Sequence, residues 1–216
     1  MIGQARIKVC GITRAADAAM ALAQGADFLG INCWSDSPRF VPAEKRVALL
    51  REIPAAQRVA VTVNPTVAES AALLAEGFAV VQAHFDPAKA ECDPKGLSAK
   101  LGAKALWLAP KLADGAEWPA DLIPLAAGFV HDAHAKDAFG GTGKVSDWGR
   151  FRKLVQAYPN SLWILAGGLG PDNIAAATQS GATFFDLNSG VELAPGLKSA
   201  EKLSGVSEVL LKNSQS

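Results

Sequence analysis

Short apolar runs alternate with helix-like segments along the whole chain, and no linker or low-complexity stretch interrupts the alternation. Each run is bounded by glycine, proline or polar residues, which is typical of a β-strand. The runs stay apolar on both sides, as expected of parallel strands that are covered on both faces. The predicted strands are 6–10, 28–32, 59–63, 78–84, 103–108, 127–132, 162–166 and 183–187.

Between these strands, apolar residues recur at the spacing of an amphipathic helix. Segment 114–124 is the poorest, because two prolines and a glycine leave room only for a short helix. Eight alternations favour a single (β/α)₈ TIM barrel over residues 1–216 rather than an open doubly wound sheet. No GxGxxG follows the first strand to support a dinucleotide fold. The predicted helices include 42–51, 67–75, 148–158 and 199–211, and a weak helix is predicted over 96–101.

Composition and charge narrow the class of protein. The chain has 216 residues, half of them apolar, and its 21 basic residues balance 21 acidic ones. This balance indicates neither a nucleic-acid partner nor a membrane surface. The start of the chain has no apolar segment of signal-peptide length, and no run approaches the roughly 20 residues of a membrane span. Three cysteines without CxxC spacing fit a reducing compartment. We therefore expect a cytoplasmic protein.

Polar and reactive residues gather at the carboxyl ends of the predicted strands, where barrel enzymes carry their active sites. Strand alternation puts each of them on the same side as the residue two positions earlier. Their neighbours on the other side are apolar and suited to contact helices, so the polar set is expected to point inward. His131 is the exception, which we expect to face a helix. The inward pairs are Lys8 with Cys10, Gln82 with His84, Val130 with Asp132, and Phe184 with Asp186.

Three glycine-containing turns follow the last three strands, in the region where barrel enzymes often hold a phosphate. Glycines leave backbone N–H groups uncovered, so a phosphate can approach them closely. Surface loops that need glycine for a positive φ angle are the alternative. The candidate residues are Gly140, Gly141, Thr142 and Gly143, then Gly167 and Gly168, then Asn188, Ser189 and Gly190.

Six motifs resemble the phosphoribosylanthranilate isomerase family, in order and over nearly the whole chain. They are KVCGIT (8–13), SPRF (37–40), VQAH (81–84), GGTGK (140–144), AGGL (166–169) and SGVE (189–192). The resemblance implies a (β/α)₈ barrel without a cofactor and a step of tryptophan biosynthesis. That step is the Amadori rearrangement of N-(5-phosphoribosyl)anthranilate, an aminoaldose, into the corresponding 1-amino-1-deoxyketose, so the implied ligand is a small phosphorylated molecule.

The resemblance also implies three roles. Asp132 would be the general acid that opens the furanose ring, Cys10 the general base at C2 of the sugar, and Arg39 the ligand of the anthranilate carboxylate. A thiol needs a cation nearby to ionise at neutral pH, and Lys8 is the candidate. Asp132 must be protonated when it acts, which burial or a nearby acid such as Asp186 would favour. We also count Asp186 among the substrate-binding residues.

Two other functions stay open, one of them because the chain departs from the family pattern. His84 is followed by Phe85 and Asp86, and the loop 32–36 lacks the usual lysine before SPR. A paralogue that binds a sugar phosphate without turnover is one alternative. The other is a metal-dependent barrel hydrolase with Asp132, His134, His84 and Asp186 as ligands, although the chain has only three histidines. The oligomeric state, a second sugar-phosphate substrate and the role of His84 stay open.

Overall fold

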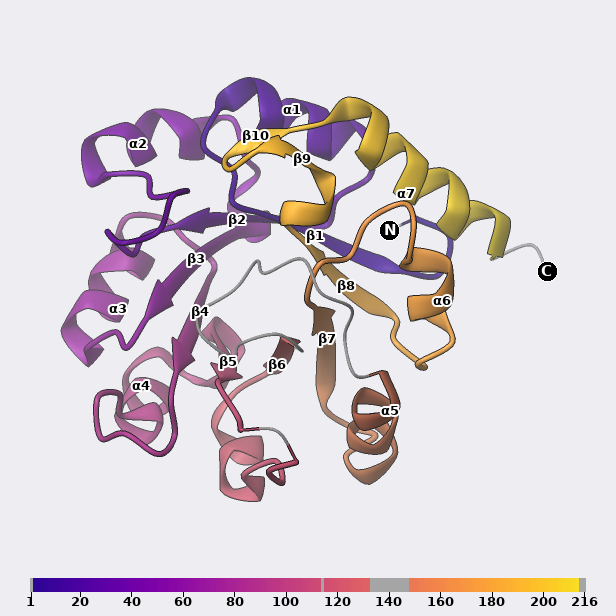
Figure 1. The fold of residues 1–216 in the computed structure, drawn as a ribbon. Coiled ribbons are helices and arrows are strands. Elements are labelled where there is room, and N and C mark those ends of the chain that lie inside the picture. Colours follow the sequence, from indigo (N-terminus) through magenta and orange to yellow (C-terminus); the bar gives the residue numbers. More distant parts are fainter. Residues whose placement is uncertain (1, 114, 133–147, 214–216) are drawn as a thin grey trace.

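Eight parallel strands form a closed barrel in the computed structural model, which describes residues 2–113, 115–132 and 148–213 (Figure 1). The strands follow one another around the barrel in chain order, and β8 pairs with β1. The predicted TIM barrel is therefore confirmed. The strands are β1 (Arg6–Cys10), β2 (Phe28–Asn32), β3 (Arg58–Val63), β4 (Val80–Phe85), β5 (Leu106–Pro110), β6 (Gly128–Asp132), β7 (Leu162–Ala166) and β8 (Phe184–Leu187).

Helices surround the barrel on its outside (Figure 1). The connection from β5 to β6 carries a 3₁₀-helix, η3 (Ala120–Leu125), because Pro119 and Pro124 limit regular α-helix there. The other 3₁₀-helices are η1 (Ala55–Gln57), η2 (Ala103–Ala105) and η4 (Ser189–Val191). The α-helices are α1 (Ala15–Ala23), α2 (Ala43–Arg51), α3 (Val67–Ala75), α4 (Pro94–Leu101), α5 (Trp148–Ala157), α6 (Ile174–Thr178) and α7 (Ala200–Asn213).

Several element bounds shift by one or two residues, and two local features differ more clearly from the sequence prediction. The fifth strand begins at Leu106 and not at residue 103, because η2 follows Gly102, whose positive φ turns the chain. After β8 the chain forms an antiparallel hairpin of β9 (Glu192–Ala194) and β10 (Leu197–Lys198), which was not predicted. Both strands of this hairpin are shorter than the runs from which strands are recognised in a sequence.

Strand alternation separates two layers of apolar side chains. Ile7 and Val9 belong to the layer between the strands and the helices, whereas Cys10 belongs to the layer inside the barrel. Lys8 pairs in register with Asp186 of β8, so their inward side chains meet. The predicted inward and outward faces of β1 and β8 are therefore confirmed. His131 faces outward, with its ring centroid 5.9 Å from that of Phe151 on α5.

Aromatic rings fill the barrel at the amino-terminal ends of its strands. Phe28, Trp107 and Phe184 lie with their ring centroids 5.1–5.7 Å apart, and the Arg6 guanidinium covers two of these rings. This cluster fills the barrel interior at the amino-terminal ends of the strands. The free space therefore lies at their carboxyl ends. No helix in the described part of the chain is long and apolar enough to cross a membrane.

Candidate active site

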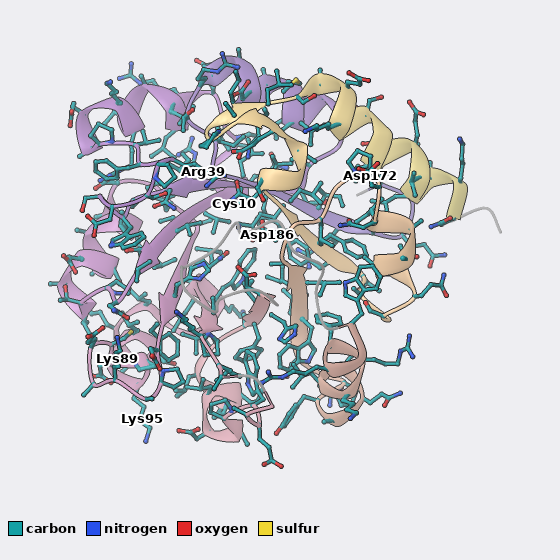
Figure 2. All side chains as sticks on the ribbon, viewed as in Figure 1. Cys10, Arg39, Lys89, Lys95, Asp172 and Asp186 are labelled. Carbon is teal, nitrogen blue, oxygen red and sulfur yellow. The ribbon has the colours of Figure 1, made fainter. Side chains whose placement is uncertain are left out.

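A cavity of about 570 Å³ opens at the carboxyl ends of the strands. Cys10 at the end of β1 and Asp132 at the end of β6 both line it. Because β7 and β8 lie between these strands on the shorter way around the barrel, the thiol and the carboxyl group lie on different sides of the cavity. Figure 2 shows Cys10, Arg39 and Asp186 close to one another on the side of the barrel formed by β8, β1 and β2, whereas Lys89, Lys95 and Asp172 lie at the periphery. Further predicted residues that line the cavity are Arg39, Gly167, Gly168, Asp186, Asn188 and Ser189.

Cys10 and Lys8 lie close to a residue of β2 that has no side chain. Cys10 pairs with Gly30, and a Cβ atom there would lie 3.0 Å from the Cys10 Sγ and 3.0 Å from the Lys8 Cε. Both distances are tighter than about nine in ten real contacts of a Cβ atom, so a side chain at Gly30 would force its neighbours to shift. Gly30 therefore provides the space in which the thiol and the lysine lie side by side.

The charges around Cys10 only partly match the expectation from the sequence. Lys8 is fully buried and donates a 2.6 Å hydrogen bond to Asp186. Burial raises the pKa of the Cys10 thiol; Lys8 opposes this effect through its charge and a hydrogen bond, but Asp186 adds to it, and the net pKa is raised. Lys8 itself loses basicity through burial, yet the neighbouring Asp186 and Cys10 raise its pKa overall. In the unliganded site, Lys8 is therefore an ammonium and Cys10 a protonated thiol.

The side chain of Arg39 passes close to the backbone of Gly11 on its way to the cavity, where a residue with a side chain would block it. Gly11 has a φ of +74°, and a Cβ atom there would lie 2.5 Å from the Arg39 Cδ and 2.7 Å from the Asn188 Oδ1. A side chain at this position would displace the arginine, and the backbone conformation would also be strained. The glycine of the CGIT motif thus sets the position of the arginine of the SPRF motif.

The Arg39 guanidinium is bound to Glu192, a partner that the sequence prediction missed. Nε lies 2.9 and 3.1 Å from the two carboxylate oxygens of Glu192, and Nη2 donates to Oε2 at 2.6 Å. Glu192 also accepts hydrogen bonds from Lys198 at 2.7 Å and from the backbone of Gly196 at 3.0 Å. Its position in the SGVE motif was the only sign of this role in the sequence.

Burial and ion pairing act in opposite directions on the ionisable groups of this cluster. Burial raises the pKa of Glu192, but its bonds to Arg39 and Lys198 outweigh that effect and lower the pKa overall. The hydrogen bonds to Glu192 raise the pKa of Arg39. For Lys198, burial dominates and lowers the pKa despite the favourable charge of Glu192. Glu192 is therefore firmly ionised, and Lys198 keeps its charge mainly through this one carboxylate.

His84 lies in the cavity wall as a neutral imidazole. Burial, with a smaller effect from the charge of Lys8, lowers its pKa to about 3. Its Nε2 lies 2.8 Å from the Nε2 of Gln82. The Gln82 Oε1 is buried and has no hydrogen-bond partner in the described part of the chain. Because His84 is uncharged over the ordinary pH range, it can accept or donate a hydrogen bond but cannot supply a cation.

The last two predicted glycine turns place free donors at the cavity. Gly167 and Gly168 have φ angles of 104° and 61°, and no hydrogen bond in the described residues uses their N–H groups or that of Ser189. The Ser189 Oγ is also buried without a partner there. Gly190 packs closely on the backbone, since a Cβ atom there would lie 2.2 Å from the Leu169 carbonyl oxygen. The turn Gly140, Gly141, Thr142 and Gly143 lies outside the described residues.

The structure describes only some of the ligands that the metal-dependent alternative requires. His134 lies outside the described residues, and among residues 2–113, 115–132 and 148–213 no group of three or more His, Cys, Asp or Glu side chains could hold a metal ion.

Residues 7–209 match the protein family described as N-(5′-phosphoribosyl)anthranilate (PRA) isomerase. The chain belongs to this family. An N-(5′-phosphoribosyl)anthranilate isomerase of Magnetococcus marinus is 37% identical over 203 residues, covering 92% of this chain and 91% of that protein. The family resemblance found in the motifs is thereby confirmed.

Solved structures of phosphoribosylanthranilate isomerases have the same fold. The crystal structure of the Thermus thermophilus enzyme is 29% identical, covers 96% of this chain and 99% of its own, and has a TM-score of 0.82. A second isomerase was crystallised with reduced 1-(o-carboxyphenylamino)-1-deoxyribulose 5-phosphate. It is 24% identical, covers 97% of this chain and 99% of its own, and has a TM-score of 0.71, a likeness of fold.

Proposed function

We propose that this member of the isomerase family converts N-(5-phosphoribosyl)anthranilate into 1-(2-carboxyphenylamino)-1-deoxyribulose 5-phosphate. One observation carries the proposal beyond family membership. A thiol, a carboxyl group and a guanidinium from distant parts of the chain line one cavity at the carboxyl ends of the barrel strands. An aldose-to-ketose rearrangement needs one acid and one base, and this substrate adds a carboxylate that needs a cation.

The proposed chemistry uses Asp132 as acid and Cys10 as base. Asp132 gives a proton to the ring oxygen of the furanose, the bond between C1 and that oxygen breaks, and the nitrogen lone pair forms a protonated Schiff base. Cys10, once ionised, takes the proton from C2, and the electrons of that bond move toward the nitrogen to give an enolamine. The enol hydroxyl at C2 then gives up its proton while the electrons of the C1=C2 bond take up a proton at C1, which yields the ketone. The placement of the two residues on different sides of the cavity supports this division, because the two protons belong to different atoms of one sugar.

Arg39 is proposed to bind the anthranilate carboxylate. It lines the cavity together with Trp34 and Asp36, which belong to the loop that departs from the family pattern. A guanidinium presents paired donors that match a carboxylate in geometry and charge. In this proposal the loop 32–36 forms part of the wall near the aromatic ring of the substrate. The carboxylate is recognised by an arginine for which Gly11 leaves space and to which Glu192 is bonded.

The phosphate of the substrate is proposed to bind at Gly167, Gly168 and Ser189, with the turn 140–143 as the further predicted part. The unused N–H groups and the buried Ser189 hydroxyl support this assignment. A crystal soaked in sulfate is expected to show an anion within hydrogen-bond distance of these donors. A control crystal of Ser189→Pro, which lacks the N–H and the hydroxyl, should bind it more weakly. An anion found only elsewhere in the wild-type crystal would contradict the assignment.

A fluorescence assay tests the function directly. The purified protein should remove the fluorescence of phosphoribosylanthranilate, generated in the cuvette from anthranilate, without added metal or cofactor. Cys33→Ser is a matched control, because this partly buried thiol does not line the cavity and should leave the rate unchanged. An inert wild type that still binds ribose 5-phosphate would favour the non-catalytic paralogue. Turnover that disappears on treatment with a chelator would favour a metal-dependent enzyme.

A further inference from the structure

Glu192 covers one edge of Arg39 and leaves another edge open. The carboxylate of Glu192 contacts Nε and Nη2, which together form the side edge of the guanidinium. No hydrogen bond in the described part of the chain reaches Nη1 of Arg39. A guanidinium has five N–H donors in one plane, so the end edge of Nη1 and Nη2 still offers two of them. Arg39 can therefore hold Glu192 and a second carboxylate at the same time.

Burial and hydrogen bonds fix the positions of Arg39, Glu192 and Lys198, which together form the carboxylate-site cluster. The side chain of Glu192 is only 4% exposed, and that of Lys198 is fully buried. Lys198 also donates to the Asn188 Oδ1 at 3.1 Å, and the same oxygen lies next to the space kept free by Gly11. The orientation of the guanidinium plane is thus determined before a ligand arrives, which reduces the ordering that binding requires.

The charges of the cluster also suit one incoming carboxylate. Arg39 and Lys198 are cationic and Glu192 is anionic, so the three side chains together carry one positive charge. The negative charge of Glu192 neutralises one of the two positive charges of Arg39 and Lys198. An anionic ligand at the open edge completes the balance, with each carboxylate on its own edge of Arg39.

We propose that Glu192 is a positioning residue for carboxylate recognition: it holds the side edge of Arg39 so that the end edge receives the anthranilate carboxylate of the substrate. This inference rests on the proposed function for the identity of the ligand. Lys198 supports the arrangement by keeping Glu192 ionised and by balancing its charge. Glu192 itself has no contact with the reacting atoms in this proposal.

The test measures the affinity for two small molecules that resemble different ends of the substrate. Free anthranilate probes the carboxylate site, and ribose 5-phosphate probes the rest of the cavity. In Glu192→Gln, the KM for phosphoribosylanthranilate and the Kd for anthranilate should each rise by about tenfold, the size expected for loss of one well-oriented charged hydrogen bond. The kcat and the Kd for ribose 5-phosphate should change by less than about threefold.

Glu76→Gln is the matched control. Glu76 binds the same two nitrogens of its arginine, Nε and Nη2 of Arg46, each at 2.8 Å, but this pair does not line the cavity. It should lose stability without a change in either Kd. Glu192→Asp keeps a carboxylate as the partner of Lys198 but draws it back from Arg39, so its Kd for anthranilate should lie between those of wild type and Glu192→Gln.

Three results would overturn the inference. The first is a wild-type KM and anthranilate Kd in Glu192→Gln. The second is an equal loss of affinity for anthranilate and ribose 5-phosphate, which would indicate a general structural role. The third is the same pattern in Glu76→Gln. Because both Kd values are measured without turnover, an inactive wild type would count against the proposed function and not against the positioning role.

Discussion

Replacement of Cys10 by serine and of Asp132 by asparagine should each lower kcat by roughly 10²–10⁴, the usual effect of removing a positioned base or acid. Serine is far less acidic than the thiol and cannot take the C2 proton at neutral pH, and asparagine has no proton to give to the ring oxygen. The KM should stay within a small factor of wild type, because neither side chain is proposed to hold the ground state. Stopped-flow or steady-state fluorescence with phosphoribosylanthranilate measures both parameters.

The pH dependence gives an independent check on the base. Burial raises the pKa of Cys10, and only the thiolate can act as base, so kcat/KM should rise with pH through that raised pKa. The rising limb should therefore lie on the alkaline side of an ordinary thiol, whose pKa is about 8.5. It should be absent in the serine variant. Wild-type turnover in both Cys10→Ser and Asp132→Asn would show that the proposed acid and base are wrong.

Lys8→Met should lower the free energy of unfolding by about 3–5 kcal/mol, the range for removing one partner of a buried ion pair. Lys8 is fully buried, its ammonium lies 2.6 Å from Asp186, and the variant leaves that carboxylate in the barrel interior without its cation. Denaturation by urea, followed by tryptophan fluorescence, measures the change. Lys8→Met combined with Asp186→Leu should recover much of the loss, because the double variant leaves no unpaired charge.

The pH range of this effect follows from the pKa of Lys8. That pKa is raised in the folded protein, so the contribution is fully present below the ordinary lysine value and declines only as the pH rises through the folded value. The difference between wild type and Lys8→Met should thus be constant through neutral pH. Arg14→Met is the comparison, because its pair with Asp17 is half exposed on the arginine side and should contribute far less. A loss from Lys8→Met no larger than that from Arg14→Met would contradict the prediction.

The sequence by itself was enough for the architecture and for the side on which each strand residue lies. Apolar runs and helical spacing repeat eight times, and this pattern is local, so the barrel and the helix α3 (Val67–Ala75) could be predicted before any contact was known. Alternation along a strand is equally local, which is why Lys8, Cys10 and Asp186 were expected to point inward. The boundaries were less certain where short 3₁₀ turns, such as Ala103–Ala105, adjoin a strand.

Only the tertiary structure decided which of these residues meet and what their charges become. The pairing of β8 with β1 brings Lys8 opposite Asp186, and the register of that pairing cannot be read from either strand alone. Arg39 and Glu192 are 153 residues apart in sequence, and their contact depends on the hairpin after β8 and on the gap left by Gly11. The pKa of Cys10 could likewise not be predicted from the sequence. The sequence identified the cation beside the thiol, but burial and the carboxylate of Asp186 outweigh it, and both effects arise only when the barrel closes.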